Sequence, residues 1–198
     1  MTPATMHAAR IGPNAIIQTI ASLREVYAPD ELPKLLVGGA EVYLSQLPHE
    51  MIPEEQFHAL VKLLTPRLGT EQAGAILYRS GERTADYVRA NRLPGPFRSL
   101  LGILPAQLGL RLLLIAISKH AWTFAGSGTF TFGIGRTPWI SIGTPIDHDT
   151  SAISAVLCRY YCGSFTQLLR QVVSQRIELR ETSCQARGGN ACVYQIVL

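Results

Sequence analysis

The segments Cys158-Arg-Tyr-Tyr-Cys162 and Glu181-Thr-Ser-Cys184-Gln-Ala-Arg-Gly-Gly-Asn-Ala-Cys192 decide the fold of this chain. All four cysteines of the protein lie in these two segments. With Glu181, three of them form a pattern of one Cys, a long helical and strand stretch, and then Glu-x-x-Cys-x7-Cys. Thiolates and a carboxylate at this spacing can close a tetrahedral zinc site. Disulfides are the alternative, and the redox state of the compartment decides between them.

The last two cysteines are expected to face each other across a terminal hairpin. Cys184 and Cys192 are equidistant from a turn at Gly188, and side chains directly opposed on neighbouring strands have Cβ atoms roughly 5 Å apart. Glu181 precedes Cys184 by three positions, so in an ideal strand the two would point to opposite faces. A zinc site therefore requires a β-bulge or a strand end between Glu181 and Cys184.

The remaining ligand must come from the helix that packs beneath the hairpin. Cys158 is the expected ligand, and Cys162, one turn later on the same helix face, is its competitor. Four protein ligands leave no open position for water, so the zinc would be structural and would hold the helix to the hairpin. The alternative is that these cysteines are ordinary buried thiols, because free cysteine is among the most buried residue types.

The composition is apolar and lightly charged. Of 198 residues, 47% are hydrophobic and 16% are charged, and the mean hydropathy is +0.16. The surplus apolar surface must meet a partner subunit, a ligand or a membrane surface. Residues 1–13 show no secretory signal, and the longest apolar run, 108–118, is interrupted by Arg111 and too short to span a bilayer. We therefore expect a cytoplasmic protein with reduced thiols, which disfavours disulfides.

The net charge of +4 is spread along the chain. Nucleic-acid binding usually shows as a clustered basic stripe, and the arginines here form no dense block. We expect no nucleic-acid partner. A mild positive balance also suits an anionic small ligand or an acidic protein.

Hydrophobic periodicity predicts helices first and strands later. The expected helices cover residues 13–26, 42–47, 53–66, 71–91, 97–120 with a break at Pro105, and 151–174. The expected strands cover residues 122–125, 129–132, 139–142, 176–184 and 191–198. Gly74 and Gly81 each cost about 1 kcal/mol inside a helix, so we expect them to allow close packing. This order predicts an α+β fold in which helices cover one face of an antiparallel sheet.

Two stretches resemble the vinyl-4-reductase domain family. They are Tyr161-Cys-Gly-Ser-Phe165 and Glu181-Thr-Ser-Cys-Gln-Ala-Arg-Gly-Gly-Asn-Ala-Cys-Val-Tyr194, and the helix that begins Gly74-Ala-Ile-Leu-Tyr is similar to that domain's opening helix. The resemblance covers residues 70–198 and implies that residues 1–69 are an N-terminal helical extension. The whole chain is similar to those family members that serve bacteriochlorophyll biosynthesis in purple phototrophic bacteria.

The resemblance carries several implications. The fold would be a plait similar to the small subunits of vesicle-tethering complexes. The zinc ligands would be Cys158, Glu181, Cys184 and Cys192, and not Cys162. The domain would bind an aromatic ligand and form a homodimer. The activity would be either reduction of the 8-vinyl group of a divinyl tetrapyrrole, as in a divinyl (proto)chlorophyllide 8-vinyl reductase, or tetrapyrrole carriage.

The motifs favour carriage over catalysis. Hydride chemistry needs a cofactor, and no G-x-G-x-x-G follows a predicted strand and opens a helix; a flavin site, with its looser signature, stays open. We expect the chain to bind a porphyrin, Mg-porphyrin or protoporphyrin intermediate and to pass it between the magnesium-insertion and methylation enzymes of the pathway. Peripheral contact with the photosynthetic membrane is compatible with this role. The alternatives are the 8-vinyl reductase and a pigment-free interaction scaffold.

A tetrapyrrole site needs aromatic walls, cations for carboxylates and an axial ligand for magnesium. The candidates of these three kinds are Tyr78, Tyr87, Trp122, Phe124 and Trp139 as walls, Arg83, Arg98 and Arg111 as cations, and His120 and His148 as axial ligands. Each has a plainer interpretation, as a core aromatic, a solvated surface charge or a helix-end residue.

Overall fold

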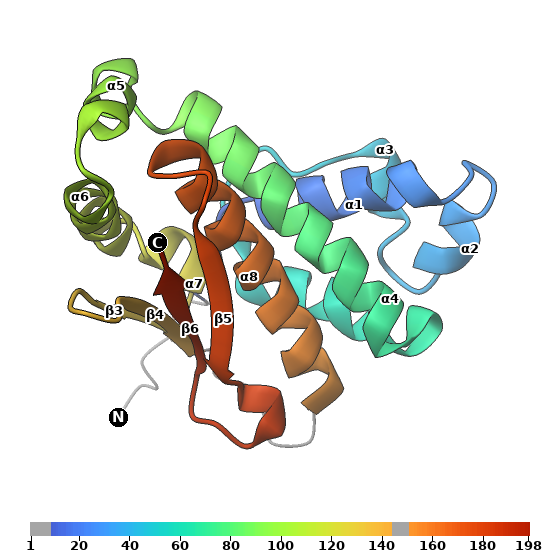
Figure 1. Cartoon of the computed structure of the whole chain (residues 1–198). Helices are drawn as coiled ribbons and strands as arrows, with labels where there is room; N and C mark the ends of the chain where they lie inside the picture. Colours follow the sequence, from blue (N-terminus) through green and yellow to red (C-terminus); the bar gives the residue numbers. More distant parts are fainter. Residues whose placement is uncertain (1–8, 144–150) are drawn as a thin grey trace, which may run out of the picture.

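The computed structural model describes residues 9–143 and 151–198 and has the expected α+β architecture (Figure 1). Its main sheet contains β3 (Thr129–Gly133), β4 (Trp139–Gly143), β5 (Glu178–Ser183) and β6 (Cys192–Val197). The strand order is β3-β4-β6-β5, and all neighbours are antiparallel. The predicted antiparallel sheet packed against helices is therefore confirmed.

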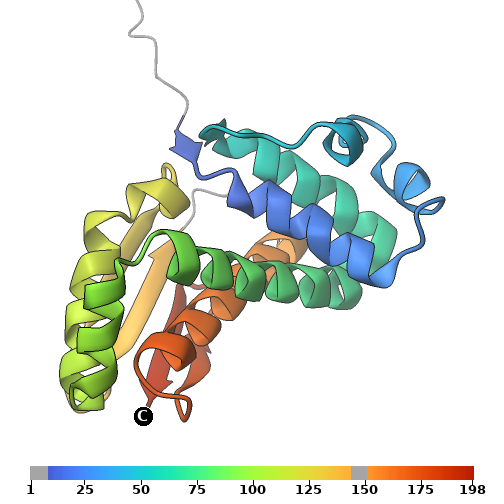
Figure 2. The ribbon, with the colours of Figure 1, turned by 90° about the horizontal axis from the view of Figure 1, so that it is seen from above.

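The helices form successive layers on one face of this sheet. The helix α8 (Ser151–Val172) packs on the sheet, α4 (Glu54–Asn91) packs on α8, and α1 (Asn14–Val26) packs on α4 (Figure 2). In β6 the side chains of Cys192, Tyr194 and Ile196 are buried, while the alternate positions are half-buried. This period of two places the buried face of β6 towards α8.

Two glycines allow α4 and α8 to approach closely. A Cβ atom at Gly81 of α4 would clash with the Tyr160 carbonyl oxygen of α8. A Cβ atom at Gly163 of α8 would clash with the Tyr78 carbonyl oxygen of α4. The close packing predicted at Gly81 is confirmed, since no larger residue fits without separating the two backbones.

Shorter elements complete the described chain. A two-stranded sheet pairs β1 (Arg10–Ile11) with β2 (Ile52–Pro53). The remaining helices are α2 (Leu32–Leu36), α3 (Val42–Ser45), α5 (Gly95–Ile103), α6 (Ala106–Lys119), α7 (Trp122–Ala125) and the 3₁₀ turn η1 (Gln185–Arg187). Seen from above in Figure 2, α5 and α6 stand beside the sheet, away from α1.

Two predicted elements differ in the structure. Residues 122–125 form the short helix α7 and not a strand, and Gly126 ends it at φ 58°. The helix predicted to stop at Pro66 continues through it and kinks at Gly69, where φ is 75°. A positive φ favours glycine, so the chain bends three residues after the proline. The predicted boundary between an N-terminal extension and the following domain, at residue 69, stays a prediction. The helix α4 runs across this position.

Candidate metal centre

The four predicted ligands lie together at one end of the sheet. Cys158 comes from α8, Glu181 from β5, Cys184 from the residue after β5, and Cys192 from β6. Their ligand atoms all lie within 4.8 Å of one another. The three cysteines are buried and Glu181 is at the surface. Residues separated by 34 positions in sequence therefore meet at a single point.

A β-bulge turns Glu181 towards the cysteines. In the β5–β6 ladder, Glu181 pairs with Tyr194 but Ser183 pairs with Val193, so Thr182 is an extra residue. An extra residue reverses the alternation of side chains along the strand. The bulge that the spacing required is confirmed. The bulge allows Glu181 and Cys184 to share one face of the sheet, although they are three positions apart in the sequence.

The turn after β5 places Cys184 beside Cys192. The chain leaves the strand at Cys184 and enters the 3₁₀ turn, which ends at Gly188 with φ 84°. The Gly189 N–H donates a hydrogen bond of 3.0 Å to the Cys184 carbonyl oxygen. This bond closes the loop at the cysteine, so the backbone at the candidate ligand is held from both sides.

The sulfur positions support two chemistries. Cys184 Sγ lies 3.7 Å from Cys158 Sγ, close to the edge of about 3.8 Å that a tetrahedron with zinc–sulfur bonds of about 2.3 Å requires. The Cys158 and Cys192 sulfurs, however, are paired as a disulfide with a Cα–Cα distance of 6.2 Å, within the range usual for such bonds. The sequence disfavoured disulfides, and the structure instead brings these two buried sulfurs within bonding distance of each other. The same sulfurs cannot serve both arrangements at once.

The donor set suits zinc when the thiols are reduced. Three sulfurs and one carboxylate oxygen are a recognised zinc-binding combination. Burial, together with the neighbouring Glu181, raises the pKa of the Cys184 thiol, so this thiol favours its protonated form. A divalent cation reverses that preference, because thiolates coordinate metals deprotonated.

Two neighbours orient the ligands, and neither was predicted. Arg187 Nη2 donates to Glu181 Oε2 at 2.8 Å, and the Tyr194 hydroxyl donates to the Cys158 carbonyl oxygen at 2.7 Å. Tyr194 is almost fully buried, and burial raises the pKa of its hydroxyl above the usual range. The alternation in β6, with Tyr194 two residues after Cys192, is the signal that could have identified it.

Cys162 lies outside this four-residue group. Its side chain is half-buried, its Sγ lies 4.0 Å from Thr166 Oγ1, and burial raises the pKa of its thiol. Among the described residues, the group of possible metal ligands contains Cys158 and does not contain Cys162.

The aromatic candidates on α4 are each covered by an arginine. The guanidinium of Arg159 lies 4.8 Å from the centre of the Tyr78 ring, and that of Arg92 lies 5.9 Å from the Tyr87 ring. Such cation–π contacts contribute about 0.5–1 kcal/mol at exposed sites. Both tyrosines therefore have partners within the protein at the helix surface.

Arg83 joins two helices. Its Nη1 makes an ion pair with Glu25 of α1, and its Nε donates to Gln18 Oε1 at 3.2 Å. Arg79 also pairs with Glu25, at 3.0 Å, and its hydrogen bond and charge, with the charge of Arg83, lower the pKa of Glu25. In this structure Arg83 stabilises the α1–α4 contact.

Two further candidates lie on opposite faces of the sheet. Phe124 packs edge-on against Phe130 at 5.5 Å and Phe165 at 5.9 Å between ring centres, within the core side of the sheet. Trp139 is 37% exposed and belongs to the alternate positions of β4, opposite Gly133. They do not form two walls of one site.

The last candidates are exposed on α6 and directly after it. Arg111 lies on α6, His120 caps its C-terminus, and Trp122 begins α7 with 61% of its surface exposed. His148 lies outside the described residues. The structure thus places Arg111, His120 and Trp122 on neighbouring helices and distributes the other candidates over α4, α7 and the sheet.

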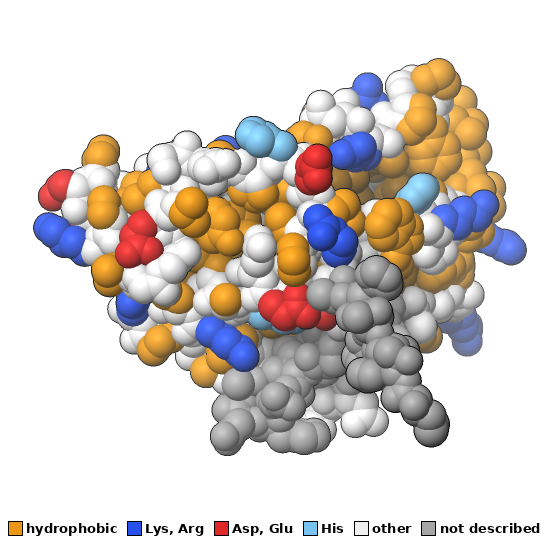
Figure 3. Space-filling model, turned by 180° about the vertical axis from the view of Figure 1, so that it is seen from behind, with side chains coloured by type: hydrophobic (Ala, Val, Ile, Leu, Met, Phe, Trp, Pro, Cys, Tyr) orange, Lys and Arg blue, Asp and Glu red, His pale blue; other side chains and the backbone are white. Residues whose placement is uncertain are grey.

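Beside these residues lies an apolar surface. We call it the α5–α6 face, and it consists of Leu100, Ile103, Leu108, Leu112 and Ile115. Figure 3 shows hydrophobic side chains gathered over this part of the molecule, at the upper right of the view. Leu108, Leu112 and Ile115 follow the i, i+4, i+7 spacing of one helix face, and Ile103 is 82% exposed. Contiguous exposed apolar surface usually marks a binding site.

Within residues 9–143 and 151–198, none of the helices combines the length and hydrophobicity needed to cross a membrane.

The arrangement of helix layers over an antiparallel sheet has counterparts among solved structures. A mutant H-NOX protein from K. algicida, in its Fe(II) unliganded state, matches with a TM-score of 0.54 at 12% identity, over 94% of this chain and 95% of that one. An H-NOX protein from S. oneidensis in the Fe(II)NO ligation state matches with a TM-score of 0.51 at 14% identity, over 93% and 98%. The fold is therefore H-NOX-like; likeness to vesicle-tethering subunits stays a prediction.

Sequence relatives define the family. The bacteriochlorophyll synthase 23 kDa chain of Cereibacter sphaeroides is 37% identical over 98% of this chain and 93% of its own length. The protein of the same name from Rhodobacter capsulatus is 36% identical over 93% and 85%. The chain belongs to the bacteriochlorophyll synthase 23 kDa chain family. No protein-family model matches the chain, so the vinyl-4-reductase domain stays a prediction.

Proposed function

We propose that the chain serves bacteriochlorophyll biosynthesis by binding a porphyrin or Mg-porphyrin intermediate and passing it between biosynthetic enzymes. The pathway follows from the name of the relatives, which are 36–37% identical along nearly the whole chain. The observation that favours binding is the exposed α5–α6 face. A carrier needs such a surface because its ligand must be both protected from water and released.

The chemistry of the α5–α6 face suits a flat apolar ring. Leu108, Leu112 and Ile115 offer aliphatic contact along α6. Arg111 lies on the same helix, and Trp122 follows it. An aromatic ring system buries large apolar areas, and a cation near its edge can meet a carboxylate. His120 is a candidate axial ligand for the magnesium of a bound Mg-porphyrin.

Fluorescence quenching with Mg-protoporphyrin tests this proposal. We expect saturable binding at micromolar protein, weakened about tenfold by Leu108→Glu because a buried leucine contributes roughly 1.5–3 kcal/mol. Val26→Glu is the matched control, since Val26 is similarly exposed but lies on α1. The absence of saturable quenching by the wild-type chain would contradict porphyrin binding. If both variants weakened binding equally, the porphyrin site would not lie on α6.

Reduction of the 8-vinyl group is the second candidate function. It is suggested by the resemblance to the vinyl-4-reductase family, and it requires a hydride donor. Purified protein supplied with NADPH or reduced flavin and a divinyl substrate would show it by turnover to the monovinyl product. Turnover without any added protein would replace carriage as the leading function.

We also propose that reduced Cys158, Cys184 and Cys192, with Glu181, hold one structural zinc. The convergence of the four ligand atoms within 4.8 Å supports it. The ion would connect α8 to the β5–β6 hairpin, and these four residues would be its complete shell. Metal analysis of protein purified under reducing conditions should give one zinc per chain. Cys192→Ser should abolish it and Cys162→Ser should retain it; zinc retained by Cys192→Ser would disprove the ligand set.

Handover implies partners, and we propose the magnesium-insertion and methylation enzymes, with the chain acting as a homodimer in the cytoplasm or at the photosynthetic membrane. Analytical ultracentrifugation of the chain alone tests the dimer. Repeating it with each enzyme, with and without pigment, separates a carrier from a scaffold. A carrier should associate more tightly when loaded, whereas complexes that form equally without pigment would support the scaffold.

A further inference from the structure

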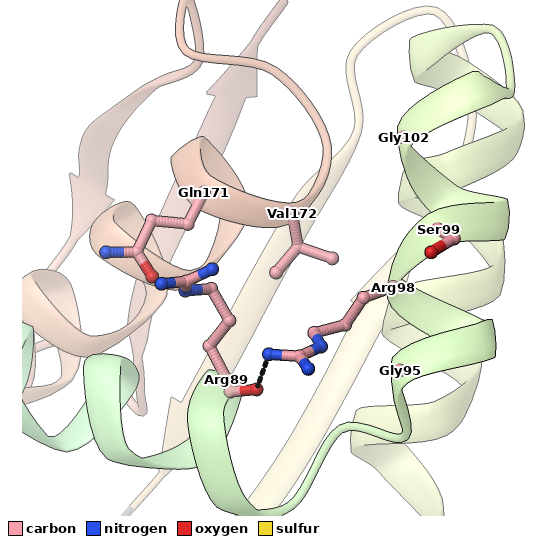
Figure 4. Close-up of a pocket in the computed structure, with 7 residues that line it drawn as sticks. All are labelled: Arg89, Gly95, Arg98, Ser99, Gly102, Gln171 and Val172. Carbon is pink, nitrogen blue, oxygen red and sulfur yellow. Dashed lines mark hydrogen bonds between the residues drawn. The ribbon is translucent and has the colours of Figure 1, made fainter.

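A pocket opens between the end of α4, the start of α5 and the end of α8 (Figure 4). Its volume is about 390 Å³, at the lower end of the range of about 300–1,000 Å³ usual for ligand sites. The lining residues are Arg89, Gly95, Arg98, Ser99, Gly102, Gln171 and Val172. The turn at Pro94 brings the two arginines, nine positions apart, to the same pocket.

The two guanidinium groups have donors to spare. Arg98 Nη1 donates to the Arg89 carbonyl oxygen at 3.0 Å, and Figure 4 shows this bond holding the Arg98 side chain at the pocket. Among the described residues the Arg89 guanidinium has no hydrogen-bond or ion-pair partner. The nearby Asp86 is engaged elsewhere, because its Oδ1 accepts from the amides of Gln167 and Gln171. Asp86 keeps its negative charge nearby, but among the described residues neither Arg89 nor Arg98 makes an ion pair with a carboxylate.

Neutral groups add to this arrangement. The first turn of α5 begins at Gly95; because Pro96 has no N–H and the Arg98 N–H donates to the Pro94 carbonyl oxygen, this helix start offers an anion fewer backbone donors than usual. Ser99 contributes a hydroxyl, and a Cβ at Gly102 would meet nothing within 4 Å, so a ligand can approach the backbone there. Gln171 Oε1 is a buried acceptor without a partner. Buried polar atoms are rarely left unpaired; because this oxygen is an acceptor, it needs a donor such as an ordered water and does not itself pair with a carboxylate.

We infer that this pocket is an oxyanion site that takes the carboxylates of the bound ligand. This assignment rests on the proposed function, because a porphyrin intermediate carries propionate groups at one edge. Arginine forks pair with carboxylates through two parallel hydrogen bonds. The exposed Leu100 and Ile103 lie at adjoining positions of the same helix. In this assignment the ring rests on the α5–α6 face and its acidic edge reaches Arg98 and Arg89.

Comparing a diacid with its ester isolates the pocket. Mg-protoporphyrin and its dimethyl ester differ only at the two propionates, which are charged carboxylates in the diacid and neutral methyl esters in the other, and their affinities are measured by fluorescence quenching. We expect Arg89→Gln and Arg98→Gln each to weaken diacid binding about tenfold, as loss of a charge-assisted pair would, and to leave ester binding unchanged. Arg98→Lys should recover part of the loss. Arg136→Gln, an exposed arginine in the β3–β4 turn, is the control and should match the wild type.

The outcomes separate this inference from the proposed function. Diacid binding that is equal in wild type and both glutamine variants would overturn the pocket assignment and leave porphyrin binding intact. If the wild type bound neither porphyrin, the proposed function would fail, and titration with inorganic phosphate followed by NMR would decide the pocket. Phosphate shifts lost in Arg89→Gln and Arg98→Gln but kept in Arg136→Gln would support an oxyanion site for a free anion. No phosphate shifts in that case would overturn it.

Discussion

The cysteine end of the sheet and the α5–α6 helix pair differ in how far their apolar side chains are exposed to solvent. Around the cysteines, α8 and the inner face of β6 bury their apolar side chains, and Tyr160, Tyr161 and Tyr194 are each at most 5% exposed. On α5 and α6, leucine and isoleucine side chains are left at the surface. Because burial of apolar area drives folding, the first region stabilises the fold and the second retains apolar surface for binding. The predictions below test this division, from the largest expected effect to the smallest.

The largest effect is expected where α4 meets α8. Gly163→Val should destabilise the protein by about 3 kcal/mol or more, because the new side chain would overlap the Tyr78 carbonyl oxygen and force the helices apart. Gly102→Ala on α5 is the matched change in open space, and it should stabilise by up to about 1 kcal/mol through helix propensity. Urea unfolding followed by circular dichroism measures both. Similar effects of the two changes would contradict the division between the regions.

The cysteine cluster should respond differently in its two redox states. Cys184→Ala should cost about 2–4 kcal/mol in reduced, zinc-loaded protein, since a metal ligand is lost. In oxidised protein, where Cys158 and Cys192 are paired, it should cost only about 1 kcal/mol for lost packing. Thermal unfolding with zinc and reductant, and again with chelator and oxidant, gives the comparison. An equal cost in both states would exclude Cys184 as a structural ligand.

The buried tyrosines should make the fold sensitive to alkali. Burial raises the pKa of Tyr160 to about 12 and that of Tyr194 further still. Since the folded pKa exceeds the unfolded value of about 10, the folded state retains the proton longer, and stability present below pH 10 is lost as the pH rises towards 12. Tyr160 alone would account for roughly 2–3 kcal/mol. Tyrosinate absorbance from these residues should stay absent from the folded protein at pH 10; their ionisation near pH 10 without unfolding would disprove their burial.

The smallest effect is expected on the α5–α6 face. Ile103→Gln should change the free energy of unfolding by less than about 0.5 kcal/mol, because 82% of the side chain is already exposed. Leu101→Gln, at a fully buried position two residues earlier, should destabilise by about 2–4 kcal/mol. Chemical denaturation measures both variants. A large loss for Ile103→Gln would show that this face is structural in the monomer.

Much of the fold follows from local patterns in the sequence. The β5–β6 hairpin and its bulge follow from the spacing of Glu181, Cys184 and Cys192, because strand alternation and a turn at Gly188 leave few other arrangements. The helix α7 was missed, since a four-residue segment with two aromatics has no clear period. The helix through Pro66 was predicted to end too early, because this proline removes a hydrogen bond within the helix but the chain bends only at Gly69, three residues later.

The ligand pocket candidates were less predictable. Aromatic and arginine residues recur throughout the sequence, and their chemistry does not reveal which partners they have. Arg83 pairs with Glu25, 58 positions away, and Tyr78 lies under Arg159. Arg89 and Gln171, which line the pocket of Figure 4, belong to no motif. These relations depend on long-range packing, which no sequence spacing within one helix encodes.

By itself the sequence determined the α+β class, the close helix packing at Gly81 and the candidate ligands Glu181, Cys184 and Cys192, because periodicity and spacing are local properties of the chain; spacing alone left Cys158 and Cys162 as competitors for the remaining position. The tertiary structure alone decided that Cys158 and Cys192 come close enough to bond, that the α5–α6 face stays uncovered and that two arginines from different helices enter one pocket. The physical reason is that such arrangements depend on how helices and strands pack, and packing joins residues that the sequence holds far apart.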